Sequence, residues 1–103
     1  MLIATSGVIP GKEYEVLGLV KGNTVQTVNV LKDIGAGLKS IVGGELKSYT
    51  KMMEESRSKA MEKIEYEAVS LGADAIIGIR FTTSAIMQGA SEILVTGTAI
   101  KFK

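Results

Sequence analysis

The stretch ELKSYTKMMEESRSKAMEKIEYEAVSLGADAIIGIRF, residues 45–81, decides the fold that we predict for this chain. Its first part predicts one long helix over Glu45–Leu71, with Gly72 as the stop signal after it. Apolar residues recur there at steps of three, four or seven, which is typical of one buried helix face. This apolar stripe consists of Leu46, Tyr49, Met53, Ala60, Ile64, Ala68 and Leu71. The opposite side carries mixed charge and is expected to face water.

The residues after Asp74 predict a strand, because the run AIIGIRFTT is aliphatic and follows the helix stop directly. We expect its odd positions to pack on the helix: Ala75, Ile77, Ile79 and Phe81. The last segment, SEILVTGTAIKFK, predicts another strand with apolar residues in both rows. One row is Leu94, Thr96, Thr98, Ile100 and Phe102, and the other is Ile93, Val95, Gly97, Ala99 and Lys101. A turn at Gly89, within SAIMQGAS, predicts that the two strands form a hairpin.

The segment before the helix predicts short strands separated by turns. Met1–Ser6 is typical of a short strand, and EYEVLGLV, residues 13–20, alternates like another one. Lys21-Gly22-Asn23 between hydrophobic runs predicts a turn. The next run, residues 24–30, is either a second short strand or an extended lead-in. Residues 32–42 place apolar side chains at helical spacing and predict a short amphipathic helix.

Length and composition define a single domain over residues 1–103 and exclude several classes of function. Twelve basic residues against eleven acidic ones leave a net charge of +1, so neither nucleic acid nor an anionic membrane is an expected partner. The sequence begins without the basic region of a secretory signal, which favours a cytoplasmic location. No apolar run reaches the roughly 18 residues of a membrane-spanning helix.

The three predicted strands carry apolar residues or glycine on both sides, whereas a sheet that meets water on one side should alternate. One long helix covers only one face. The other face must be covered by the short helix, by the N-terminal segment or by another copy of the chain. We favour a homo-oligomer, since closed symmetric assembly commonly hides surplus apolar surface. Gly18, Gly78 and Gly97 agree with this, because a glycine within a strand lets another backbone approach.

The runs IVGGE, SYTKMMEESRSKAMEKIEYEAVSLGADAIIGIRF and VTGTAIK together resemble the YbjQ-like family over nearly the whole chain. The marks of this resemblance are Gly43-Gly44-Glu45, Tyr49, Arg57, the turn Leu71–Ala75 and Gly97-Thr98-Ala99. The resemblance implies an α+β, dodecin-like β-α-β-β subunit with a long helix packed on an antiparallel sheet. It also implies additional short strands and a ring that is a homopentamer. It implies no established activity and no cofactor.

The family carries a heavy-metal-binding label, which these residues do not support. The chain contains no Cys and no His, so only carboxylates and Met remain as side-chain ligands. Soft and borderline metals are normally held by thiolate and imidazole. We therefore expect no metal site.

The glycine pair Gly43-Gly44 in front of Glu45 is the first candidate ligand site. Free N–H groups at a helix start bind anions, but the carboxylate of Glu45 already satisfies the helix dipole there. The Gly-Lys pair of a phosphate loop is missing, since no glycine precedes Lys39. We favour a backbone hinge at these glycines over an anion site.

Arg57 is the second candidate, because helical spacing predicts that it lies within the apolar stripe. A charge there requires an acidic partner, and Glu45, Asp74 and Glu92 are the candidates that the sequence cannot rank. Recognition of a carboxylate or phosphate is the alternative, which the guanidinium geometry suits. We favour a structural ion pair, either inside the chain or across a subunit interface.

Catalysis has no support in the sequence, because the Ser and Thr hydroxyls have no His to activate them. We expect no enzyme, but a homo-oligomeric scaffold or binding module. The alternative is a small-molecule or anion site at subunit interfaces, formed by Gly43, Gly44, Glu45 and Arg57. Metal binding, which the family label suggests, is a third and less favoured function.

Overall fold

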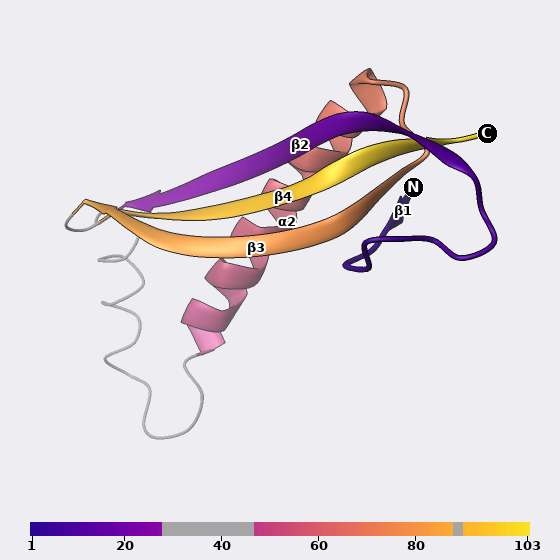
Figure 1. Ribbon diagram of the computed structural model, residues 1–103. Helices are drawn as coiled ribbons and strands as arrows, with labels where there is room; N and C mark the ends of the chain where they lie inside the picture. The colour runs from indigo at the N-terminus through magenta and orange to yellow at the C-terminus, as the bar shows by residue number, and fades with distance from the viewer. Residues whose placement is uncertain (28–46, 88–89) are drawn as a thin grey trace.

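The computed structural model describes residues 1–27, 47–87 and 90–103. These residues form a four-stranded sheet in the order β1-β3-β4-β2, with one helix across one face (Figure 1). The elements are β1 (Leu2–Ile3), β2 (Tyr14–Thr27), α2 (Lys47–Ser70), β3 (Ala75–Met87) and β4 (Ala90–Phe102). The α+β class, the long helix on a sheet and the final hairpin are confirmed. The predicted short helix at residues 32–42, the candidate site residues Gly43, Gly44 and Glu45, and the turn glycine Gly89 lie outside the described residues.

The sheet is mixed, which corrects the prediction of an antiparallel one. β2, β4 and β3 are antiparallel neighbours, but the two-residue β1 pairs with β3 in parallel. The hairpin strand β3 also continues to Met87, so residues 84–87, expected in the connection, belong to the sheet. In the described part of the chain, no helix combines the length and the apolar character needed to cross a membrane.

The C-terminal end of α2 agrees with the predicted stop at Gly72. Gly72 has a φ of 80°, a left-handed conformation that favours glycine. The N–H of Gly72 donates to the carbonyl of Val69 at 2.9 Å, and the N–H of Ala73 donates to the carbonyl of Ala68 at 3.0 Å. This pair of hydrogen bonds is a Schellman motif, which satisfies the last carbonyls of the helix and turns the chain into β3.

The buried face of α2 differs in part from the predicted stripe. Residues at successive steps of four are buried along it: Met52, Ser56, Ala60, Ile64 and Ala68. Met53 is only half-buried, and Leu71 and Arg57 are exposed. Steps of four follow a ridge that is inclined to the helix axis, and α2 crosses the strands diagonally (Figure 1). The predicted stripe was assumed to run parallel to the helix axis. It therefore wrongly placed Arg57 on the buried face and did not include Ser56.

β2 is one continuous strand, and the turn predicted at residues 21–23 is wrong. Gly22 instead lies directly beneath α2. A Cβ atom at this position would overlap the carbonyl oxygen of Ala60 and lie 2.8 Å from the backbone nitrogen of Ile64. The neighbouring Thr24 hydroxyl donates to the carbonyl of Ser56 at 3.0 Å. Glycine is therefore needed here because the helix backbone rests on the strand.

β3 changes the face it presents to the helix at Gly78. Gly78 has a φ of 63°, and the register with β4 shifts between Ile77 and Arg80. As a result Ile76 and Ile79 both belong to the core between sheet and helix, while Ala75 and Ile77 lie on the opposite face. The predicted odd row is therefore right after the bulge and wrong before it. The two rows predicted for β4 are confirmed: Ile93, Val95 and Ala99 are buried on the helix side, and Ile100 packs on the other face.

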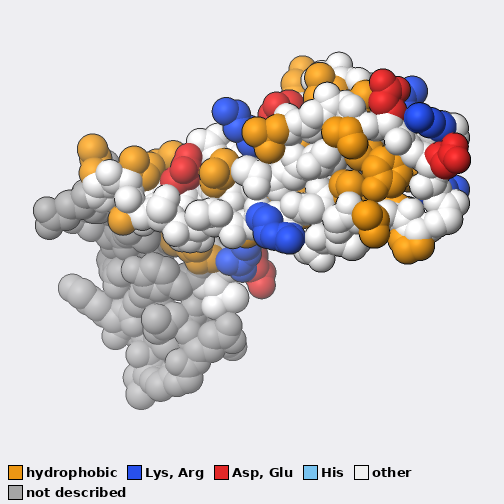
Figure 2. Space-filling model, in the orientation of Figure 1, with side chains coloured by type: hydrophobic (Ala, Val, Ile, Leu, Met, Phe, Trp, Pro, Cys, Tyr) orange, Lys and Arg blue, Asp and Glu red, His pale blue; other side chains and the backbone are white. Residues whose placement is uncertain are grey.

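The face of the sheet away from α2 is covered at one end only. There Ala75, Ile77 and Ile100 form a second cluster, on which Ile9 of the N-terminal segment packs. The N-terminal segment thus covers part of this sheet face, which is one of the three alternatives that the sequence predicted. Beside this cluster, Val16 and Leu19 of β2 pair with Ile100 and Thr98 of β4 and are 61% and 68% exposed. Figure 2 shows apolar side chains along this face, gathered most densely at the end that holds both chain termini.

Candidate groove between the helix and strand β3

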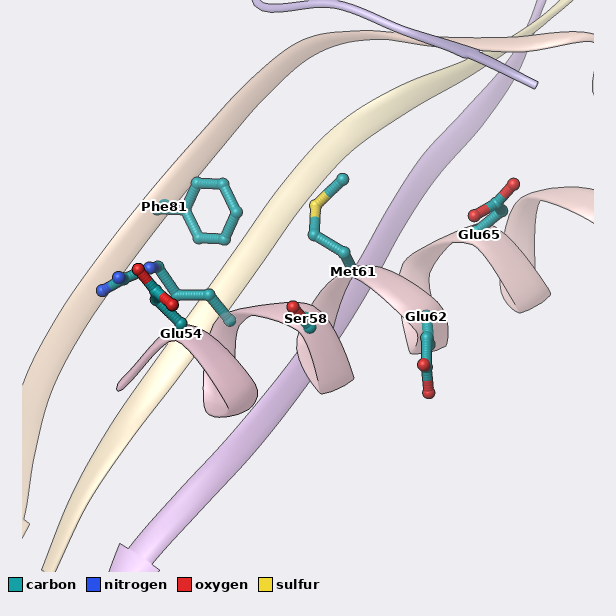
Figure 3. Close-up of a pocket in the computed structure, with 7 residues that line it drawn as sticks. Glu54, Ser58, Met61, Glu62, Glu65 and Phe81 are labelled. Carbon is teal, nitrogen blue, oxygen red and sulfur yellow. The ribbon is translucent and has the colours of Figure 1, made fainter. Parts of the chain in front are cut away.

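An open groove of about 590 Å³ lies between α2 and β3. Seven residues line it: Glu54, Arg57, Ser58, Met61, Glu62, Glu65 and Phe81. Six of them come from α2 and recur at helical spacing, and Phe81 comes from β3. Met61 and Phe81 point into the space between the helix and the strand, whereas Glu62 points away from the sheet (Figure 3).

The groove combines an apolar strip with an acidic rim. Met61 is half-buried and Phe81 is 47% exposed, so Phe81 still offers aromatic surface to a ligand. The lining contains three carboxylates, those of Glu54, Glu62 and Glu65, and the guanidinium of Arg57, so its net charge is −2. By Coulomb attraction such a lining favours a cationic group with apolar surface over an anion.

Arg57 lies in this groove and is exposed, so the prediction that it is buried in the apolar stripe is wrong. Two of its three candidate partners are engaged elsewhere. The carboxylate of Asp74 accepts the N–H of Phe102 at 2.9 Å, and the carboxylate of Glu92 accepts the side-chain amide of Asn23 at 3.0 Å. Exposure removes the desolvation cost that required an ion pair. Recognition of an anion by Arg57 stays a prediction.

The sequence did not indicate that Met61 and Phe81 meet. Met61 is not part of the predicted apolar stripe, and Phe81 is predicted only as one member of a strand row. Residues 20 positions apart on different elements share no sequence pattern. The bulge at Gly78 turns Phe81 toward α2, and this bulge is a property of the folded sheet. A glycine within an aliphatic strand is the one signal that could have suggested it.

The residues present do not fit a heavy metal. Over residues 1–27, 47–87 and 90–103, no three Asp, Glu, His or Cys side chains are grouped so that they could hold an ion. The whole chain has no thiol and no imidazole, which are the ligands that such metals prefer. The side chains of the described residues therefore offer no suitable ligand set for a heavy metal.

Comparison with known proteins gives concordant matches over the full chain. A family model described as "Putative heavy-metal-binding", the YbjQ model, matches residues 1–103. A UPF0145 protein of Clostridium novyi is 55% identical over 101 residues, which cover 98% of each chain. A UPF0145 protein of Psychromonas ingrahamii is 54% identical over 104 residues, covering 100% of this chain and 99% of that one.

A solved structure supports the fold. It is a protein of unknown function of the DUF74 family from Pediococcus pentosaceus, with a TM-score of 0.73 and 20% sequence identity. The match covers 100% of this chain and 98% of the other. The full-length family match and the identities above 50% agree with each other. The chain therefore belongs to the YbjQ (UPF0145) family.

Proposed function

We propose that this protein is a non-catalytic, homo-oligomeric scaffold or binding module of the cytoplasm. Its dodecin-like subunits would close into a ring, for which we propose five copies. The single observation behind this proposal is the apolar surface that remains on the sheet face away from α2. Val16 and Leu19 lie there, and each is more than half exposed.

A further copy of the chain is a suitable cover for this surface. Fully burying an aliphatic side chain contributes about 1.5–3 kcal/mol, so the exposed parts of Val16 and Leu19 would each contribute about 1–2 kcal/mol to association. The N-terminal segment already covers the neighbouring cluster on the same face through Ile9. An interface would therefore continue an apolar surface that starts inside the subunit. In a closed ring each subunit uses two different surfaces, so all copies are covered equally.

The test is native mass spectrometry of the unmodified protein and of Leu19→Lys at the same micromolar concentration. The proposal expects a single species of several subunits for the unmodified protein and a smaller species for the variant. Val69→Lys is the matched control, because Val69 is 59% exposed but lies on α2. It should leave the subunit number unchanged. A monomer mass for the unmodified protein would refute the assembly.

A second candidate is binding of a small anion by Arg57, and the exposure of Arg57 favours it over a buried ion pair. The three carboxylates in the same groove oppose it. Isothermal titration with inorganic phosphate, on the unmodified protein and on Arg57→Met, tests this candidate. If Arg57 binds the anion, the unmodified protein should release or absorb heat on binding phosphate, and Arg57→Met should not. Equal heats for both proteins would remove Arg57 from consideration.

A further inference from the structure

The two outer edges of the sheet differ in the protection of their backbone groups. On the β2 edge, the carboxylate of Glu67 accepts the N–H of Lys21 at 3.3 Å. The ammonium of Lys63 donates to the carbonyl of Asn23 at 2.7 Å. Both charged side chains belong to α2 and occupy backbone groups that another strand would need. Charged side chains at an edge are a common means of preventing strand addition.

The β3 edge is covered only over its first residues. Ala4 donates to the carbonyl of Ile76 at 2.9 Å and accepts the N–H of Ile79 at 3.1 Å. Backbone groups alternate in direction along a strand, so the groups that follow Ile79 on this same edge are those of Phe81, Thr83 and Ala85. Within the described part of the chain, these three residues have no backbone partner on the open side.

The open part of β3 is suited to accept another strand. Residues 81–87, FTTSAIM, are all exposed and contain no charge, no proline and no glycine. They extend over roughly 23 Å at about 3.3 Å per residue. Uncharged segments with high β-propensity pair readily with added strands. On this edge the guanidinium of Arg80 occupies only the carbonyl of Ile79, at 2.9 Å. Among the described residues, no charged side chain occupies the backbone groups of residues 81–87, whereas two side chains of α2 occupy those of the β2 edge.

The groove on α2 lies beside this edge. Phe81 belongs to both, since it lines the groove and its backbone begins the open edge. Figure 1 shows the first half of α2 extending past the β3 side of the sheet. A strand added to β3 would therefore lie over α2. Every second side chain of that strand would point toward Met61 and Phe81, with Glu54 and Glu65 on the neighbouring turns of α2.

We propose that the β3 edge and this groove together bind an extended polypeptide segment in which apolar and basic side chains alternate. Main-chain hydrogen bonds to Phe81, Thr83 and Ala85 would supply affinity, as in other cases of strand addition. The apolar strip and the net charge of −2 would select the side chains. This inference rests on the binding-module part of the proposed function and does not depend on the subunit number.

A second copy of this chain is a poorer occupant of the groove. Its own open edge, FTTSAIM, contains no Lys or Arg that could face the three carboxylates. Its β2 edge is occupied at Lys21 and Asn23 by side chains of α2. Charge complementarity therefore favours a basic segment of another polypeptide.

The first test uses two fluorescein-labelled synthetic peptides with blocked ends, KVKVKVK and EVEVEVE. Fluorescence anisotropy at low salt should give a dissociation constant at least about tenfold lower for the lysine peptide, a difference of about 1.4 kcal/mol. High salt should reduce this difference, because exposed charges are screened. Equal affinity of the two peptides, or no binding of either, would overturn the proposal.

The second test blocks the edge itself. Thr83→Pro removes an outward N–H without removing a bond to β4, so the strand should still form. Val25→Pro is the matched control, because by the alternation from Lys21 its N–H points outward on the β2 edge. Binding of the lysine peptide should weaken at least about tenfold in the first variant and stay unchanged in the second. Equal effects of both variants would count against the β3 edge.

Amide hydrogen exchange supplies a readout that needs no variant. The amides of Phe81, Thr83 and Ala85 should exchange rapidly in the free protein and slowly with the lysine peptide. Protection that rises with protein concentration in the absence of peptide would assign the edge to a second copy and overturn this proposal. A monomer mass together with intact peptide binding would refute the assembly and leave this site in place, so the two failures are distinguishable.

Discussion

Replacing Gly22 with alanine should destabilise the protein because α2 rests directly on this residue. The added methyl group would overlap the carbonyl oxygen of Ala60 and lie 2.8 Å from the backbone nitrogen of Ile64. Both atoms belong to the helix backbone, so the methyl fits only if the helix moves away from β2. Overpacking of this kind costs about 1–3 kcal/mol, and the rigidity of its neighbours places Gly22 in the upper half of that range.

The unfolded chain reduces this cost only slightly. Gly→Ala lowers the conformational entropy of the unfolded state, which stabilises by about 0.4–1 kcal/mol. The net loss for Gly22→Ala is therefore about 1–2.5 kcal/mol. For a domain of this size each kcal/mol corresponds to about 4–8 °C, so Tm should fall by about 4–20 °C.

Urea unfolding followed by circular dichroism, at one fixed protein concentration, measures this effect. Gly7→Ala is the matched control, because a Cβ atom at Gly7 meets nothing within 4 Å. Gly97→Ala should be intermediate, since its Cβ meets side-chain rather than backbone atoms at the shortest distances, the Cγ2 of Ile76 at 2.7 Å and the Cδ1 of Ile79 at 2.9 Å, and the Cδ1 is the far end of its side chain and can rotate. A midpoint for Gly22→Ala that equals or exceeds that of Gly7→Ala would refute the close approach of helix and strand.

Three further predictions concern the bulge, the core and the protected edge. Gly78→Ala should lower the free energy of unfolding by about 1–2 kcal/mol in urea melts through its positive φ of 63°, and Gly78→Asn should cost less. Ile64→Ala, at a fully buried position, should lower the free energy of unfolding by about 2–5 kcal/mol in the same melts. Tyr66 is 80% exposed, so Tyr66→Ala should change this free energy by no more than about 0.5 kcal/mol. Removing both Lys63 and Glu67 by alanine should expose the β2 edge and raise light scattering at high protein concentration, with little change in Tm. Scattering equal to that of the unmodified protein would contradict this last expectation.

Helix and strand were predicted correctly where a single local sequence feature, such as a helix stop or simple alternation, determines the structure. The helix was predicted as residues 45–71 and is observed at Lys47–Ser70, because Gly72 both ends the periodic pattern and adopts the left-handed conformation of a helix stop. The two rows of β4 were also predicted correctly, since simple alternation holds along the whole of that strand. The candidate groove was predicted only in part: Arg57 was singled out, but with the wrong environment.

Two glycines, compared with a third whose role was predicted, show why the remaining features could not be predicted. Gly22 in Lys-Gly-Asn has the composition of a turn, yet it marks the place where a helix 38 residues later packs on the strand. Gly78 interrupts an aliphatic row, and only the register with β4 shows that the strand changes faces there. Gly72, by contrast, acts within its own helix. The sequence identifies the glycine in each case, but its role depends on what lies opposite.

The sequence by itself determined the element types, the end of the long helix, the single α+β domain and the family resemblance. These depend on interactions between residues close in the chain, which periodicity and capping residues record. Only the tertiary structure decided which face of β3 meets α2, that Arg57 is exposed, and that side chains of α2 occupy backbone groups of the β2 edge. Those features depend on the angle at which α2 crosses the sheet and on the bulge at Gly78, and both arise from contacts between segments distant in sequence.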